Sequence, residues 1–369
     1  NVATDFVNPV AVHDVKGNLV LQRSQHRGVG RIVRLAQGIT GVWENYRIYL
    51  DGGKDLAAFH SEVPLFAMFD DHEIYNDILG AGQAGLRVDA RSLDITGRTI
   101  GQVERTVFRD PALQAWQNYV GWANPDAGVS QPIRFGRGQL TASSDILFDP
   151  SGRFDRLDLA RSGTLHVQWG HGNTGVYRIE AVVDPHRLRI FPAAIVTEDA
   201  RYSIGTNHHT RFRVGNCEFF ILDTRSYRTL HNAKDPFDPT TTMIGQRQFD
   251  WLVEAMSRSD ADFHFVVSSV SFVIPHDNGA LKKGQGNKDE SWTAHAVERN
   301  RLLDFFDSLK APVFLLTGDI HNSFSIRVTP KVWEFLCGPH SSPNHYISDM
   351  GSIPLSGNYD SRGRPVTVR

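Results

Sequence analysis

Four short apolar runs, each ended by polar residues, constrain the fold of this chain more than any other feature. Val, Ile, Leu and Phe are dense in these runs, and polar or turn residues bound them, which is typical of buried strands. In layered α/β folds, ligands bind beyond the C-terminal ends of such strands. We therefore expect the four ends to share one crevice. The runs are residues 64–69, 218–222, 263–274 and 312–316.

Helical patterns lie between these runs. Residues 245–259 and 298–310 repeat apolar side chains at intervals of three and four and leave their charges on the opposite side. Residues 41–62 and 110–122 also have helical patterns. Since the helix at 298–310 directly precedes the strand at 312–316, the two form a helix-to-strand unit. The chain as a whole is therefore expected to have an α/β (α+β) fold.

One stretch has a different pattern. Residues 131–215 contain short segments of alternating polarity, separated by Gly, Asp, Asn and Pro, which predict several strands. We interpret this stretch as a β-rich insertion. The expected domains are accordingly one α/β domain, formed by residues 1–130 and 216–369, and the insertion at 131–215.

Composition excludes some classes of function. The 369 residues have a formal net charge of -2, and the sequence contains no dense run of Lys and Arg. Specific nucleic-acid binding is therefore not indicated. No apolar stretch reaches the roughly 18 to 20 residues of a membrane span. Cys217 and Cys337 allow one disulfide, although two buried thiols are the preferred interpretation. A soluble globular protein is expected.

The sequence Asp-Asp-His-Glu at residues 70–73 joins four ionisable groups at the end of the first apolar run. One reading is an ordinary helix start, in which Asp70 or Asp71 is the N-cap and Glu73 lies in the first turn. The other is a metal site, because a cation neutralises clustered carboxylates and leaves His72 free to transfer a proton. Both readings stay open from the residues alone.

Two further strand ends carry candidate functional groups. Asp319 and His321 follow the last apolar run, and residues two apart in an extended chain point the same way, so they can be metal ligands. An Asp after Gly is also common in turns. Arg225 could clamp a phosphate oxygen or pair with an acid to fix a turn. His276 is either a solvated loop residue or a metal ligand.

In their order along the chain, five motifs closely resemble the PhoD-like alkaline phosphatases, a branch of the calcineurin-like metallophosphoesterases. The resemblance runs from about residue 40 to 340, apart from the β-rich insertion. The motifs are PLFAMFDDHEIYND, FFILDTRSYR, the segment from TTTMIGQRQF to SSVSF, DESWTAHAVERNRLLDFF and VFLLTGDIHNS.

The resemblance implies a four-layer αββα sandwich that holds two metal ions, chosen from Ca, Fe, Mn, Mg or Zn. Asp71, Asp319 and His321 would be metal ligands and His72 the general acid. A metal-activated hydroxide would then attack a small phosphate mono- or diester, with Arg225 contacting substrate. Because export is common in this family, an extracytoplasmic or secreted location is expected, with a cytoplasmic one left open.

The chain departs from the family pattern in one respect. The first metal motif of the family, Gly-Asp-x-x-Tyr, is absent, since Gly-Asp occurs only at Gly318 and Asp319. We expect a missing N-terminal segment or a second polypeptide to complete the site. The alternative is a catalytically silent protein on the same fold, which binds carbohydrate or a partner through residues 131–215.

Overall fold

The structure is a computed structural model, and its elements fall into two compact units, residues 2–207 and 208–369. Each unit is described by itself. The described residues are 54–71, 73, 109–125, 133–168, 172–173, 175–229, 231, 235–276, 290–338 and 344–369, together with isolated positions before residue 54.

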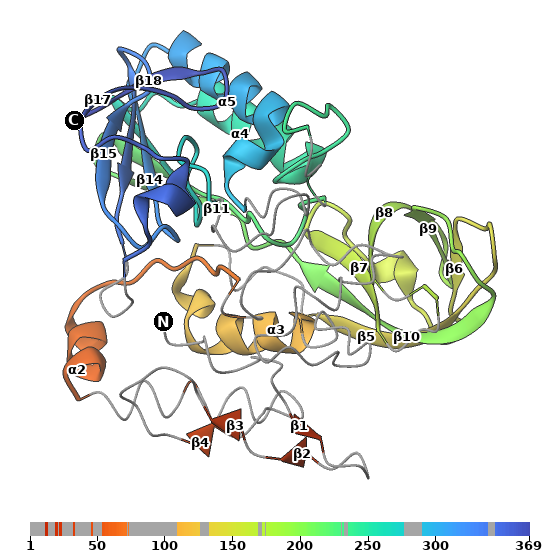
Figure 1. Ribbon diagram of the computed structural model, residues 1–369. Helices are drawn as coiled ribbons and strands as arrows, with labels where there is room; N and C mark the ends of the chain where they lie inside the picture. Colours follow the sequence, from red (N-terminus) through yellow and green to blue (C-terminus); the bar gives the residue numbers. More distant parts are fainter. Residues whose placement is uncertain are drawn as a thin grey trace. The chain divides into compact units, whose positions relative to one another are not determined.

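The unit at 208–369 is built on one eight-stranded sheet (Figure 1). The central strands β12, β13, β14 and β16 are parallel, whereas the strands that flank them pair antiparallel. In order across the sheet, the strands are β11 (Thr210–Val214), β12 (Cys217–Ile221), β13 (Phe263–Val267), β14 (Val313–Thr317), β16 (Val332–Leu336), β15 (Phe324–Arg327), β18 (Pro365–Val368) and β17 (Gly357–Asp360).

Two helices, α4 (Gly245–Ser257) and α5 (Ala296–Ser308), cover one face of this sheet (Figure 1). Their apolar stripes are buried in one core with alternate residues of the central strands. Leu252 of α4 and Leu302 of α5 are fully buried there with Val266 and Leu315. Short 3-10 helices lie at η5 (Trp292–His295) and η6 (Ile347–Met350).

The opposite face of the sheet carries a ladder of phenylalanines. Side chains alternate between the faces of a strand, so Phe265 and Phe314 point away from the helix-covered core that contains their neighbours Val266 and Leu315. The rings of Phe212 and Phe219 stack at 4.8 Å, those of Phe219 and Phe265 at 4.7 Å, and those of Phe265 and Phe314 at 5.2 Å. These four side chains are half-buried.

The unit at 2–207 contains a closed six-stranded antiparallel barrel. Leu, Ile, Val, Tyr and Phe side chains fill its interior, among them Leu165, Ile179, Leu188 and Tyr202. In order around the barrel, the strands are β10 (Glu198–Thr206), β5 (Arg134–Leu140), β6 (Ile146–Phe148), β9 (Arg187–Phe191), β8 (Gly175–Asp184) and β7 (Ser162–Gln168).

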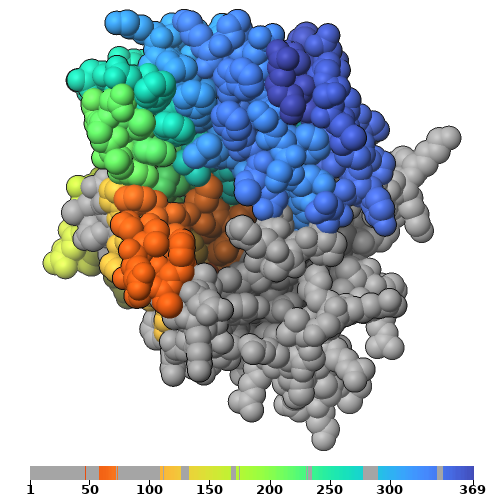
Figure 2. Space-filling model, turned by 90° about the vertical axis from the view of Figure 1, so that its left-hand side faces the viewer, coloured from red at the N-terminus to blue at the C-terminus, as the bar shows by residue number. Residues whose placement is uncertain are grey.

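Helices and short hairpins complete this unit. The orange atoms of Figure 2 show α2 on the surface, in agreement with the exposed side chain of Phe59. The remaining elements are α2 (Lys54–Glu62), α3 (Arg109–Tyr119), η3 (Gly121–Ala123), η4 (Phe154–Arg156) and the two-residue strands β1 (Val12–His13), β2 (Leu19–Val20), β3 (Gln22–Arg23) and β4 (Ile32–Val33), which pair as β1–β2 and β3–β4.

A buried polar cluster fastens α3 to the barrel. Arg109 donates to the Thr164 hydroxyl at 2.8 Å, and the Ser203 hydroxyl donates to Asp110. His166 of β7 pairs opposite Ser203 of β10 and is fully buried. Burial, with a smaller effect of the Arg109 guanidinium, lowers the pKa of His166 to about 4, and the nearby Asp110 carboxylate opposes this. His166 is therefore neutral at pH 7.

Most of the strands and helices expected from the sequence are confirmed. The strands at 218–222 and 312–316 correspond to β12 and β14, and the helices at 245–259 and 298–310 to α4 and α5. The predicted domain boundaries stay a prediction. Among the described residues, no helix is long and apolar enough to cross a membrane.

Three expectations need correction. Residues 64–69 form no strand, because the backbone of Ala67 bonds instead to the side-chain amide of Asn124, at 2.8 and 2.6 Å. The strand expected at 263–274 ends at Val267, where the chain turns. The two cysteines are free thiols but are not buried: Cys217 is half-buried and Cys337 exposed.

Candidate functional site

The candidate site in the unit at 208–369 lies at the C-terminal ends of three neighbouring parallel strands. β12, β13 and β14 are in register at Ile221, Val267 and Leu316, so their following loops leave the sheet at the same edge. These loops contain the candidate residues Arg225, His276 and Asp319. The arrangement is the one expected for a ligand site in a sheet with parallel strands.

Asp319 occupies a tight turn directly after β14. The amide of Ile320 donates to the carbonyl of Gly318 at 2.8 Å, and the φ of Asp319 is 67°, in the left-handed region that few residues other than Gly and Asn or Asp adopt. The Asp319 carboxylate bonds to Nδ1 of His276 at 2.9 Å, and both side chains are nearly buried. The turn thus directs Asp319 toward the loop that follows β13.

Three histidines stack beside this carboxylate. The ring of His345 lies 4.1 Å from that of His321 and 4.8 Å from that of His276, with interplanar angles of 28° and 29°. Burial and the charges of His276 and His321 lower the pKa of His345 to about 4, although the carboxylates of Asp319 and Asp349 oppose this. His345 is therefore neutral near pH 7, and the stack brings together loops from three strand ends.

The loop after β12 is held by a buried acid at its start. Oδ1 of Asp223 accepts bonds from the amides of Arg225, at 3.1 Å, and Ser226, at 2.8 Å, while Gln248 of α4 bonds to the Asp223 backbone. Arg225 is fully buried and donates to the carboxylate of Glu290. Its predicted contact with substrate stays a prediction.

A second group of cation-forming side chains consists of Arg228 and His231, which are close to Arg225 along the chain, and His295. The rings of His231 and His295 are 6.4 Å apart, and Arg228 donates to the carbonyl of Thr224 at 2.8 Å. Burial lowers the pKa of His295 well below its usual range, and the charges of Arg228 and His231 lower it further. A neutral imidazole therefore accompanies the Arg228 guanidinium.

Hydrogen bonds to the Glu334 carboxylate of β16 hold the segment that follows β13. This carboxylate is fully buried and accepts bonds from the hydroxyls of Ser271 and Thr317, both at 2.7 Å. It also accepts from the amides of Phe272, at 3.0 Å, and Val273, at 3.1 Å. Burial raises the pKa of Glu334, although the four bonds oppose this. The loop that ends in His276 thus has a fixed path.

In the unit at 2–207, Asp70 and Asp71 end the segment that Asn124 holds. Phe69 packs edge-on against Trp116 of α3 at 5.1 Å, and Asp71 is 2% exposed. The carboxylate of Glu73 accepts a bond from the amide of Asp70 at 2.7 Å, which is the backbone contact of a capping box. This contact is the one expected if residues 70–73 begin a helix, which is the first of the two interpretations of this motif.

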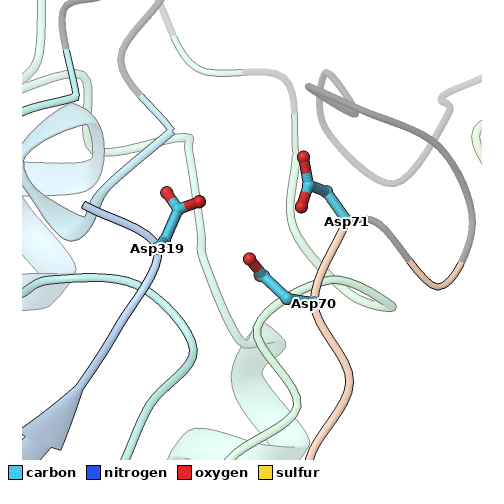
Figure 3. A group of neighbouring side chains, drawn as sticks. All are labelled: Asp70, Asp71 and Asp319. Atoms are coloured by element: carbon cyan, nitrogen blue, oxygen red, sulfur yellow. The ribbon is translucent and has the colours of Figure 1, made fainter. Parts of the chain in front are cut away.

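Figure 3 labels the acidic side chains that come into question as metal ligands, Asp70 and Asp71 on the orange segment and Asp319 after its blue strand. Asp70 and Asp71 belong to one unit and Asp319 to the other. His72, the expected general acid, lies outside the described residues. The structure thus brings Asp319 together with His276, His321 and His345 within one unit.

Sequence reasoning missed two residues at this edge of the sheet. His345 lies in a loop whose sequence has no periodic pattern. Glu334 lies within an otherwise apolar strand sequence, and its local sequence did not indicate what it contacts. A charged residue inside an otherwise buried strand is the signal that could have indicated Glu334, because buried charges are almost always paired.

Comparison with known proteins relates the segment that contains this edge of the sheet to a described family. Residues 192–361 match the model of a family described as PhoD-like phosphatase. Over 127 residues, the chain is 28% identical to alkaline phosphatase D of Bacillus subtilis (strain 168), a match that covers 32% of this chain and 21% of that protein. Residues 192–361 are thus similar to the PhoD-like phosphatases. The resemblance seen in the motifs is confirmed.

The PhoD-like segment contains all the site residues of the second unit, including Arg225, His276, Asp319, His321 and His345. It does not contain Asp70 and Asp71. A solved structure titled "Structure of PhoD" aligns with a TM-score of 0.46 and 18% identity, covering 85% of this chain and 47% of that chain. The matches thus span less than half the length of both relatives.

Proposed function

We propose that this chain takes part in the metal-dependent hydrolysis of small phosphate mono- or diesters. One observation carries the proposal: in a segment of the PhoD-like family, Asp319 lies in a left-handed turn at the end of a parallel strand and bonds to His276. Strained turns and carboxylate–imidazole pairs at strand ends are typical of catalytic and metal sites.

The residues present fit a site for hard cations. Asp319 is nearly buried, and a buried carboxylate needs a compensating charge. From the motif resemblance, we propose Asp71, Asp319 and His321 as metal ligands. Such an oxygen-rich set with imidazole suits Ca, Mn, Mg or ferric iron better than a thiolate-bound zinc.

In this proposal the metal ions would supply charge neutralisation on the phosphoryl oxygens and a lowered pKa for water. Side chains of the protein donate the proton, orient the carboxylate and contact the substrate. His72 donates a proton to the leaving alcohol oxygen. His276 holds the Asp319 carboxylate in its direction, and Arg225, if its pairing with Glu290 opens, contacts a phosphate oxygen through its guanidinium.

The phenylalanine ladder supports the four-layer αββα arrangement as part of this proposal. α4 and α5 cover one face of the eight-stranded sheet, and the opposite face presents half-buried rings. A second sheet packed about 10 Å away would bury them.

We further propose that a preceding segment or a second polypeptide supplies the remaining metal donors, and that the protein acts outside the cytoplasm.

The test of the function uses purified full chain. Metal content is measured by elemental analysis, and the hydrolysis of p-nitrophenyl phosphate and bis-p-nitrophenyl phosphate is followed before and after chelation and after return of Ca, Mn or ferric iron. We expect bound metal and turnover that chelation abolishes. The absence of both would favour the alternative, a catalytically silent protein that binds a partner through residues 131–215.

Point variants test the assigned roles. His72→Ala should lower turnover at least about a hundredfold while metal content is retained, because a general acid contributes about 10² to 10⁴ in rate. Asp319→Ala should lose metal and turnover together. Asp250→Ala, on the exposed side of α4, is the matched control and should change neither. Equal loss of metal in the His72 and Asp319 variants would show that His72 is a ligand.

A further inference from the structure

His345 connects two histidines that come from different strand ends. His276 follows β13 and His321 follows β14, and the ring of His345 stacks on both, at 4.8 and 4.1 Å. Each stacked pair has an interplanar angle below 30°. Contacts of this kind fix the plane of a ring, because displacing one ring removes the face-to-face contact with its neighbour.

The segment that carries His345 is itself held in place. The side-chain amide of Asn322, one residue beyond His321, donates to the carbonyl of His345 at 3.1 Å and contacts Sδ of Met350 at 3.3 Å. Met350 is fully buried in the core of the sheet. The backbone of His345 is therefore anchored by the loop after β14 and by the core.

The ring of His345 is in contact with its neighbours through its faces. Its ring nitrogen Nδ1 is buried and makes no hydrogen bond among the described residues. Its two ring contacts are both face to face, so stacking rather than a hydrogen bond of Nδ1 holds the plane of the ring. Side chains that orient ligands without binding the metal change metal affinity when they are removed.

We propose that His345 is a positioning residue, which sets the ring planes of His276 and His321 and through His276 the direction of the Asp319 carboxylate. The inference rests on the proposed function where it concerns metal affinity. It goes beyond that function in assigning the orientation of the site to a residue that lies after β16, outside the Asp319 and His321 motif.

Two substitutions separate ring stacking from ligation. His345→Ala removes the ring, whereas His345→Phe keeps a flat ring without nitrogen atoms. We expect Mn²⁺ binding, measured by calorimetry on the full chain, to weaken about tenfold or more in His345→Ala and to stay within about threefold of wild type in His345→Phe. His186→Ala, at an exposed turn of the barrel unit, serves as the control and should leave binding unchanged.

A second readout does not depend on metal. The imidazole resonances of His276 and His321 in the metal-free protein report ring stacking through ring-current shifts, and we expect them to move in His345→Ala and to be largely restored in His345→Phe. Unchanged resonances in His345→Ala would overturn the inference. Equal loss of affinity in both variants would overturn it too, since a nitrogen of His345 would then be a ligand.

The two proposals fail in different ways. A wild-type chain that binds no Mn²⁺, Ca²⁺ or ferric iron and hydrolyses no ester refutes the proposed function, and the resonances then still decide the role of His345. A chain that binds metal with equal affinity in wild type and His345→Ala refutes the positioning role and leaves the function standing.

Discussion

Acid should destabilise the barrel unit through His166. The pKa of this fully buried imidazole is lowered from 6.5 to about 4 in the folded chain. Well above pH 6.5 the imidazole is neutral in both the folded and the unfolded state, so the free energy of unfolding loses nothing through His166. Between about pH 6.5 and 4 the unfolded state binds a proton that the folded state does not, so stability falls as the pH falls. Below about pH 4 the loss levels off.

The magnitude follows from the shift. About 2.5 pH units at about 1.4 kcal/mol each give about 3.5 kcal/mol in full, and about 3 kcal/mol of this is lost from the free energy of unfolding between pH 7 and pH 4, because the folded state is itself half-protonated at pH 4. Other groups titrate in the same range, so the quantity to measure is the difference from His166→Leu, in which this contribution is absent. The opposing influences of Asp110 and Arg109 are already contained in the shift.

The assay is urea denaturation of the full chain at several pH values, followed by tryptophan fluorescence and circular dichroism. Wild type should lose about 3 kcal/mol more than His166→Leu between pH 7 and 4, and the exposed-site control His186→Ala should behave as wild type. A wild-type-minus-variant difference that does not change with pH would refute the reasoning, because His166 would then have the same pKa in both states.

Two further predictions concern buried carboxylates near the candidate site. Glu334→Ala should lower the free energy of unfolding by at least about 3 kcal/mol, since it leaves two hydroxyls and two amides without their acceptor. Glu334→Gln should lower it less, because one acceptor oxygen remains. Arg225→Met should cost about 3 to 5 kcal/mol by removing the guanidinium that pairs with Glu290, and the double variant with Glu290→Leu should recover most of that loss. Urea denaturation measures both; a double variant no more stable than the single one would contradict the pairing argument.

The sequence predicted the parts of the fold that depend on local periodicity. β12 and β14 follow from short, dense apolar runs, and α4 and α5 from apolar repeats of three to four residues; tertiary packing reinforces the same choice. The segment at 64–69 failed because apolar content alone does not show which partner its backbone bonds to. Here the partner is Asn124, 57 residues away from Ala67.

The candidate site was predictable where its residues follow strands and unpredictable where they come from irregular loops. Asp319 and His321 stand next to a recognisable strand, so their common direction could be read from spacing. His276 was considered only as one of two alternatives, and His345 was not considered at all. Their stacking brings together residues that are far apart in the sequence, and no local pattern encodes such a contact.

The chemical partner of each buried acid separates supporting residues from candidate functional ones. Backbone amides donate to Asp223 and Glu334, and an amide neither gains nor loses a proton in the normal pH range, so these acids fix loops. Asp319 instead bonds to an imidazole, a group that can exchange a proton and bind a metal ion. The three acids thus have two different roles, and the identity of the partner distinguishes them.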